Sequence, residues 1–146
     1  MRSLKSYKKQ EGFTIVELLI VIVVIGILAA LVITTFTGIQ QRARNTERET
    51  DIKAMHNIVE AYYAQNGYYP TLANLVAPIQ GLDAGALTAP GSGASQIDAA
   101  AATTLKYQYL ATPANCDNAG NGNCTDYTMT AALEGGGTYV KGGLAQ

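Results

Sequence analysis

The chain has 146 residues, a formal net charge of −1, 48% hydrophobic residues and 14% charged residues. This length accommodates one small domain. Positive charge gathers in the first twelve residues, the basic leader, where Arg2, Lys5, Lys8 and Lys9 face only Glu11 and give a local charge of +3. The remaining side chains therefore sum to −4, which excludes a basic surface of the kind that binds nucleic acid.

A hydrophobic run from Phe13 to Phe36 follows the leader and contains one charged residue, Glu17. At about 1.5 Å per residue, a helix of this length crosses a hydrocarbon core roughly 30 Å thick. Lys and Arg near a span favour the cytoplasmic side, so we expect the leader to stay inside and the chain after about residue 38 to cross. Three arginines after the span weaken this bias: Arg42, Arg44 and Arg48.

The boundary between leader and run reads EGFTIVE at residues 11–17. Here the chain resembles the type IV pilin family, which includes the pseudopilins of type II secretion and competence systems. Members share a short basic leader, a glycine before a hydrophobic residue, and a glutamate four residues after that. A membrane peptidase cuts after the glycine and methylates the new amine. The resemblance implies cleavage between Gly12 and Phe13 and N-methylation of Phe13.

Glu17 is an acid inside an apolar run, and an acid at the centre of a span costs about 2.5–3.5 kcal/mol. In a dry filament core its carboxylate would need a positive partner. The resemblance supplies one, the α-amine of mature Phe13 on the same or a neighbouring subunit, and so implies that both residues act in assembly. The alternative is an acid that only approaches the membrane surface. We expect Thr14 to cap the helix, and Gly26 either to loosen it or to allow close packing.

The helical pattern continues beyond the membrane run. Apolar side chains recur at spacings of three and four residues, which is typical of an amphipathic helix. These residues are Ile52, Met55, Val59 and Tyr62. Glu49 and Lys53 form a favourable i, i+4 pair on the polar side, and Gly67 and Pro70 end the helix. The sequence predicts one helix from about residue 14 to about residue 65, with its second half packed on its own domain.

The turn at residues 66–71, preceded by Tyr62 and Tyr63, also resembles the family, especially pseudopilins and minor pilins. We interpret it as a structural corner of tyrosines around a helix end. His56 is the only histidine, with no other metal-ligand residue at suitable spacing, so we expect a surface residue. Residues 81–104 are rich in small side chains. They are either a mobile loop or an irregular segment across the helix, and we expect them to face solvent or neighbouring subunits.

Alternating patterns predict three strands, at residues 105–109, 127–133 and 138–141, with a glycine turn at 135–137. The predicted fold class is α+β, a long N-terminal helix packed on a small antiparallel β-meander. We expect five segments in chain order. These are the leader at 1–12, the transmembrane and assembly helix at 13–38, its amphipathic half at 39–66, a connecting region at 67–104, and the meander at 105–146.

Two cysteines, Cys116 and Cys124, lie between the first two strands, in the part expected to cross the membrane. That location permits a disulfide, which would close a short loop. Many pilins instead enclose a larger C-terminal region, so this placement departs from the family. The Asp and Asn residues of the loop do not follow the EF-hand pattern, and we predict no metal site.

The sequence shows no nucleophile–base pair, phosphate-binding loop or metal cluster, so we predict no enzyme activity, no cofactor and no small-molecule substrate. The first hypothesis is a structural subunit of a type IV pilus that serves adhesion, motility or DNA uptake. The second is a pseudopilin of a secretion or competence system, and the third is a single-span membrane protein that does not polymerise. The resemblance implies as partners other copies and other pilins, the prepilin peptidase and methyltransferase, the pilus assembly platform and the cytoplasmic membrane. The precursor would span the inner membrane once, and the assembled subunit would lie at the cell surface. DNA binding stays open.

Overall fold

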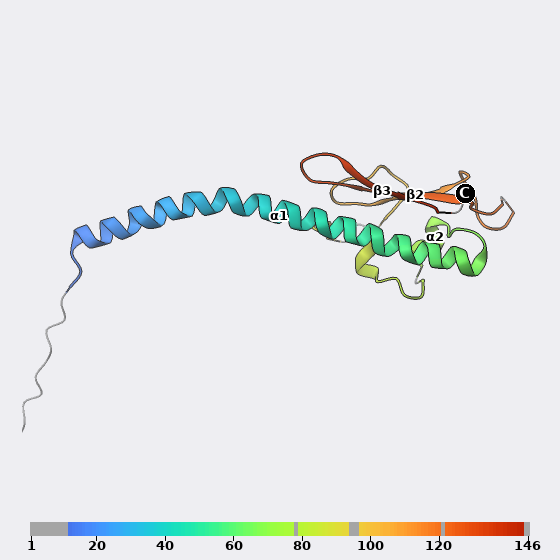
Figure 1. Cartoon of the computed structure of the whole chain (residues 1–146), viewed down its shortest axis with the longest axis horizontal. Helices are drawn as coiled ribbons and strands as arrows, with labels where there is room; N and C mark the ends of the chain where they lie inside the picture. The colour runs from blue at the N-terminus through green and yellow to red at the C-terminus, as the bar shows by residue number, and fades with distance from the viewer. Residues whose placement is uncertain (1–11, 78, 94–96, 121, 145–146) are drawn as a thin grey trace, which may run out of the picture. The chain divides into compact units, whose positions relative to one another are not determined.

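The computed structural model describes residues 12–77, 79–93, 97–120 and 122–144. The expected leader lies outside the described residues except for Gly12. The chain divides into two compact units that meet between Ile39 and Gln40. The first holds the N-terminal part of helix α1, and the second holds the rest of α1 and all the strands (Figure 1).

Helix α1 is a single helix, Ile15–Asn66, of 52 residues. Its predicted bounds, about 14 to 65, are confirmed to within one residue. The backbone N–H of Gly67 donates to the carbonyl of Tyr63 at 2.7 Å and closes the last turn. Gly67 has φ +77, a left-handed conformation that glycine adopts at little cost and that commonly ends a helix.

The first unit exposes a continuous apolar surface. Among the large hydrophobic side chains described from Phe13 to Ile39, exposure ranges from 48% at Val24 to 84% at Phe13. By length and composition, α1 can cross a membrane. A soluble monomer rarely exposes so much contiguous apolar surface, so this unit needs either lipid or other protein to cover it.

The second unit is built on the apolar stripe of α1. Ile52, Met55 and Val59 are fully buried, and they form one core with buried side chains of the sheet. The sheet has three antiparallel strands in the order β1-β2-β3: β1 (Gln108–Thr112), β2 (Asp126–Ala132) and β3 (Thr138–Gly142). The predicted α+β fold, a long helix with a three-stranded meander, is confirmed.

Alternation along the strands explains which side chains enter the core. In β2, Tyr127, Met129 and Ala131 are buried while their neighbours are not. Tyr109 of β1 pairs with Met129 and is also buried. The first strand begins at Gln108 rather than at residue 105, and Leu105 is 50% exposed. The strand start predicted at residue 105 is therefore wrong, because Leu105 precedes the β1–β2 ladder.

The segment between α1 and the sheet carries two short helices, α2 (Leu72–Val76) and η1 (Ala84–Leu87). Thr71 caps α2 by accepting a hydrogen bond from the backbone N–H of Asn74 at 3.2 Å. The expectation that residues 81–104 face solvent or neighbours is wrong in part. Four side chains from this segment are buried in the core: Ala86, Leu87, Ala89 and Ile97. These side chains are ordered here because they complete a core that other segments also build.

Candidate assembly site

The start of α1 is fixed by a reciprocal pair of side chains. The hydroxyl of Thr14 accepts a hydrogen bond from the backbone N–H of Glu17 at 3.2 Å. In return, Oε2 of Glu17 accepts from the backbone N–H of Thr14 at 2.9 Å and from its hydroxyl at 2.8 Å. This is a capping box, in which residues three apart satisfy each other's free donors. The predicted cap at Thr14 is confirmed, but the return bond from Glu17 was missed although the T-x-x-E spacing signals it.

The capping box does not exhaust the carboxylate of Glu17. Both hydrogen bonds that the carboxylate accepts from Thr14 end on one oxygen, Oε2. A carboxylate has two oxygens and about four acceptor positions. The side chain can therefore cap its own helix and still bind a nearby cation. Glu17 follows Phe13 by four residues in the sequence, and cleavage after Gly12 would create a new amine on Phe13.

Gly12 and Phe13 lie before the first helical turn, and both are exposed. A Cβ added to Gly12 would meet no described atom within 4 Å. The same holds for Gly26 in the middle of the apolar helix. Among the described residues, no close contact calls for glycine at either position.

A separate cluster of polar side chains lies within the second unit, where the β2–β3 turn meets α1, and Glu134 is its central residue. Arg44 donates through Nε and Nη2 to the two carboxylate oxygens of Glu134, each at 2.6 Å. Nη2 of Arg48 donates to Oε1 of Glu134 at 2.8 Å. The side chain of Asn45 donates to the carbonyl of Glu134 at 3.0 Å and accepts from its N–H at 2.9 Å. We call Glu134, Arg44, Asn45 and Arg48 the Glu134 clasp.

Arg48 is the buried cation of the clasp, with 1% of its surface exposed. Its Nε and Nη2 also donate to the carbonyl of Thr104, at 3.2 and 2.7 Å. A buried charge is tolerated only when it is paired and hydrogen-bonded. From the sequence, Arg44 and Arg48 were predicted only to weaken the charge bias near the span. Their partner, Glu134, was not predicted.

The Glu134 clasp should make stability depend on pH in a defined window. Hydrogen bonds from Arg44 and then Arg48 lower the pKa of Glu134 from its ordinary value of 4.5 to about 2. A lowered pKa means that the stabilisation is complete above the ordinary pKa and is lost as pH falls through the lowered one. As pH falls through this window, we expect the thermal unfolding midpoint of the wild-type chain to drop further than the midpoint of Glu134→Gln, because glutamine has no charge to lose. Parallel curves for the two proteins would contradict the assignment.

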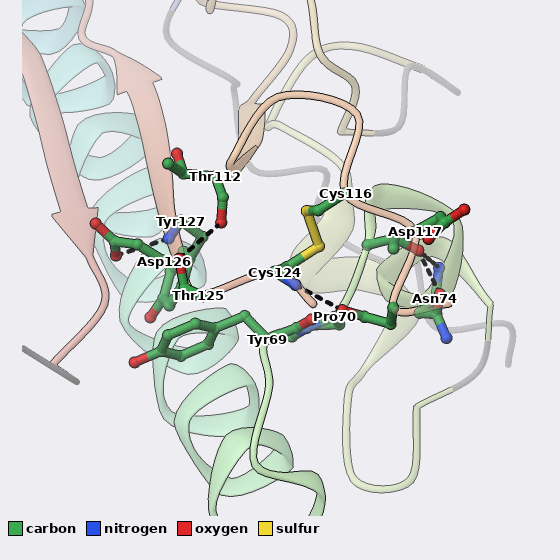
Figure 2. The surroundings of a disulfide bond; sticks show 12 residues. Tyr69, Pro70, Asn74, Thr112, Cys116, Asp117, Cys124, Thr125, Asp126 and Tyr127 are labelled. Carbon is green, nitrogen blue, oxygen red and sulfur yellow. Dashed lines mark hydrogen bonds between the residues drawn. A yellow bond between two sulfur atoms is a disulfide. The ribbon is translucent and has the colours of Figure 1, made fainter. Parts of the chain in front are cut away.

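A disulfide joins Cys116 and Cys124, with the two Cα atoms 5.2 Å apart (Figure 2). The bridge holds a short loop against the corner that ends α1. The N–H of Tyr69 donates to the carbonyl of Cys124 at 2.9 Å. Asn118, inside the loop, donates to the carbonyl of Tyr69 at 2.8 Å and accepts from the N–H of Cys124 at 2.7 Å. The loop thus anchors the tyrosine corner.

Removing the disulfide should destabilise the second unit. Its loop, with a sequence separation of 8, is expected to contribute about 2.5 kcal/mol in the chain-entropy treatment. We expect Cys116→Ser to lower the thermal midpoint while the helical circular dichroism signal at room temperature stays unchanged. Thiol labelling of the folded wild-type chain without reductant should modify neither cysteine. Full labelling of both would contradict the bridge.

Tyr69 of the tyrosine corner is buried and its ring packs against Tyr127, which also contacts His56. Nδ1 of His56 lies 2.6 Å from the hydroxyl of Tyr127, and 12% of its side chain is exposed. The expected surface position is therefore wrong, because residue 56 borders the apolar stripe and faces β2. The Tyr127 hydroxyl also donates to Glu60 at 3.0 Å. Burial, followed by this bond, raises the pKa of Tyr127 above its ordinary value, so the hydroxyl remains protonated. Within the described ranges, no group of three or more His, Cys, Asp or Glu could hold a metal ion.

Comparisons with known proteins agree with the N-terminal features. A family model described as a prokaryotic N-terminal methylation motif matches residues 7–33. Type II secretion system core protein G of Vibrio cholerae is 38% identical over 68 residues, 47% of this chain and 47% of the relative. The same protein of Aeromonas hydrophila is 39% identical over 77 residues, 53% and 50% of the two chains. The type IV major pilin protein PilA of Myxococcus xanthus is 35% identical over 74 residues, 51% and 34%. No solved structure matches.

The chain combines a long N-terminal apolar helix with a match to a methylation motif, and the relatives are structural proteins rather than enzymes. The motif and these relatives support a place for the chain in the pilin and pseudopilin family. The chain spans about half the length of the secretion proteins it matches. The apolar helix and the relatives fit a precursor in the inner membrane.

Proposed function

We propose that the chain is cleaved after Gly12, methylated on the new amine of Phe13, and polymerised through α1 into a type IV pilus that serves adhesion, motility or DNA uptake. The observation that carries this proposal is the exposed apolar helix that starts in a methylation motif. Lipid covers such a surface in the precursor, and neighbouring helices cover it in a filament. In a helix that served only as an anchor, the acid at Glu17 would act as a helix cap and nothing more.

The chemistry of assembly rests on Glu17 and Phe13. Cleavage would place a positive amine on Phe13, and the Glu17 carboxylate has acceptor positions beyond those used by Thr14. Away from water, this charge-assisted pair is stronger than a neutral hydrogen bond, and an unpaired Glu17 would be costly. The requirement that the Phe13 amine meet a Glu17 carboxylate would fix the axial displacement between neighbouring subunits in the filament. Prepilin peptidase, the assembly platform and other pilins would be the partners, and the assembled subunit would lie at the cell surface.

A pseudopilus is the second candidate, favoured by the names of the Vibrio cholerae and Aeromonas hydrophila relatives. The gene's deletion separates the two. A pilus subunit's loss should remove sheared surface filaments and leave protein secretion unchanged. A pseudopilin's loss should stop secretion of exported proteins, with no long filaments in the parent strain. If deletion changes neither the filaments nor secretion, the result would favour a membrane protein that does not polymerise.

A further inference from the structure

The second unit holds α1 by two different kinds of contact. From Ile52 to Val59, the stripe of α1 is buried in the apolar core. From residue 40 to residue 51, the only buried side chain is Arg48, and no apolar side chain is buried. This earlier stretch is held instead by polar contacts, namely the Glu134 clasp and a hydrogen bond from the hydroxyl of Tyr107 to Asp51 at 2.7 Å.

The β2–β3 turn approaches this stretch closely. A Cβ added at Gly135 would lie 2.8 Å from Nε2 of Gln41, and Gly135 has φ +88. The turn therefore favours glycine for its backbone conformation, and the Gln41 contact shows that the turn lies against the side chains of α1. It brings Glu134 to a place where two arginines from successive turns of α1 reach the same carboxylate.

We propose that the Glu134 clasp is a latch that holds residues 41–51 of α1 on the sheet and can open without unfolding the rest of the second unit. With the latch closed, the held part of α1 begins near Gln41. Opening also breaks the hydrogen bond between Tyr107 and Asp51. The held part then begins at Ile52, and residues 41–51, roughly 16 Å at 1.5 Å per residue, lose their contacts with the sheet.

The latch can open locally because the residues it releases are held by polar contacts rather than by buried apolar side chains. Without the Glu134 charge, Arg48 is a buried cation bonded only to neutral groups, which is strongly unfavourable. The guanidinium regains water if its helical turn leaves the sheet. No apolar side chain has to leave with it, because the buried stripe starts at Ile52. The tyrosine corner and the disulfide loop stabilise the opposite end of the unit and need not change.

Hydrogen exchange of the full chain in detergent micelles, followed by mass spectrometry of peptides, tests the latch without any filament. In Glu134→Gln, we expect amides of residues 41–51 and of the β2–β3 turn to exchange at least about tenfold faster than in the wild type. Peptides from 55 to 63 should keep wild-type rates. Glu49→Gln is the matched control, since it removes a partly exposed carboxylate of the same helix that forms an ion pair with Lys53 at 3.6 Å and is not part of the Glu134 clasp. It should change neither region.

Arg44→Gln is a second, milder variant. It removes the arginine that donates two hydrogen bonds to Glu134 and leaves Arg48 paired with Glu134. We expect exchange of residues 41–51 to rise in this variant, but less than in Glu134→Gln. Unchanged exchange of residues 41–51 in Glu134→Gln would overturn the proposal. An equal rise through residues 55–63 would overturn it as well, because the clasp would then be an ordinary part of one cooperative core.

Discussion

Gly12→Leu should accumulate in the membrane as uncut precursor. A peptidase must bring the backbone between residues 12 and 13 into its active site, and a branched side chain there would displace that bond. A misplacement of about 1 Å can cost about a hundredfold in rate. The substitution should leave the chain's own fold intact, since a Cβ at Gly12 meets no described atom within 4 Å. Intact-mass measurement of the membrane fraction distinguishes the precursor from the chain that begins at Phe13.

Gly26→Leu is the matched control for this experiment. It makes the same change at a second exposed glycine whose surroundings in the described chain are equally open. It should be cut as efficiently as the wild type. Normal processing of Gly12→Leu would contradict the proposed cleavage site, whereas a loss of processing in both variants would point to faulty insertion.

Glu17→Ala should insert and be processed but fail to form filaments. The substitution makes the span more apolar, so membrane insertion becomes more favourable. It also removes the negative partner that the Phe13 amine would need in a packed core. Mature protein in the membrane and sheared filaments should be quantified separately. We expect filaments to be lost and mature protein to stay near the wild-type amount, and Glu17→Lys to be at least as severe.

Glu17→Gln separates assembly from helix capping. A glutamine at this position can complete the capping box with Thr14, because its side-chain oxygen still accepts from the backbone N–H. It cannot neutralise an amine. We therefore expect Glu17→Gln to lose filaments as Glu17→Ala does. Normal filaments from Glu17→Gln would show that the carboxylate acts only as a cap, and the proposed pairing with Phe13 would be wrong.

Features that depend on local spacing could be predicted from the sequence. The three- and four-residue periodicity of Ile52, Met55 and Val59 identified the buried stripe. Alternation identified β2 and β3 to within about one residue. The short separation of Cys116 and Cys124 made a bridge feasible, and the structure contains one.

Features that depend on distant partners could not be predicted in this way. Glu134 lies 90 positions from Arg44 and 86 from Arg48, and nothing in a charged helix segment indicates which acid will fold back onto it. His56 is placed by a tyrosine 71 residues away. The small side chains of residues 81–104 enter the core because other elements form its walls. In each case the tertiary fold, rather than local pattern, decides burial.

The central claim is that this chain is a filament subunit whose mature N-terminus is Phe13. Filaments sheared from the surface of cells that express the chain should be purified, and the N-terminal peptide of their main protein should be identified by mass spectrometry. We expect this chain, beginning at Phe13 with a methylated amine and retaining the whole apolar helix. A chain found only in the membrane with Met1 still attached, or cut beyond Phe36, would contradict the claim.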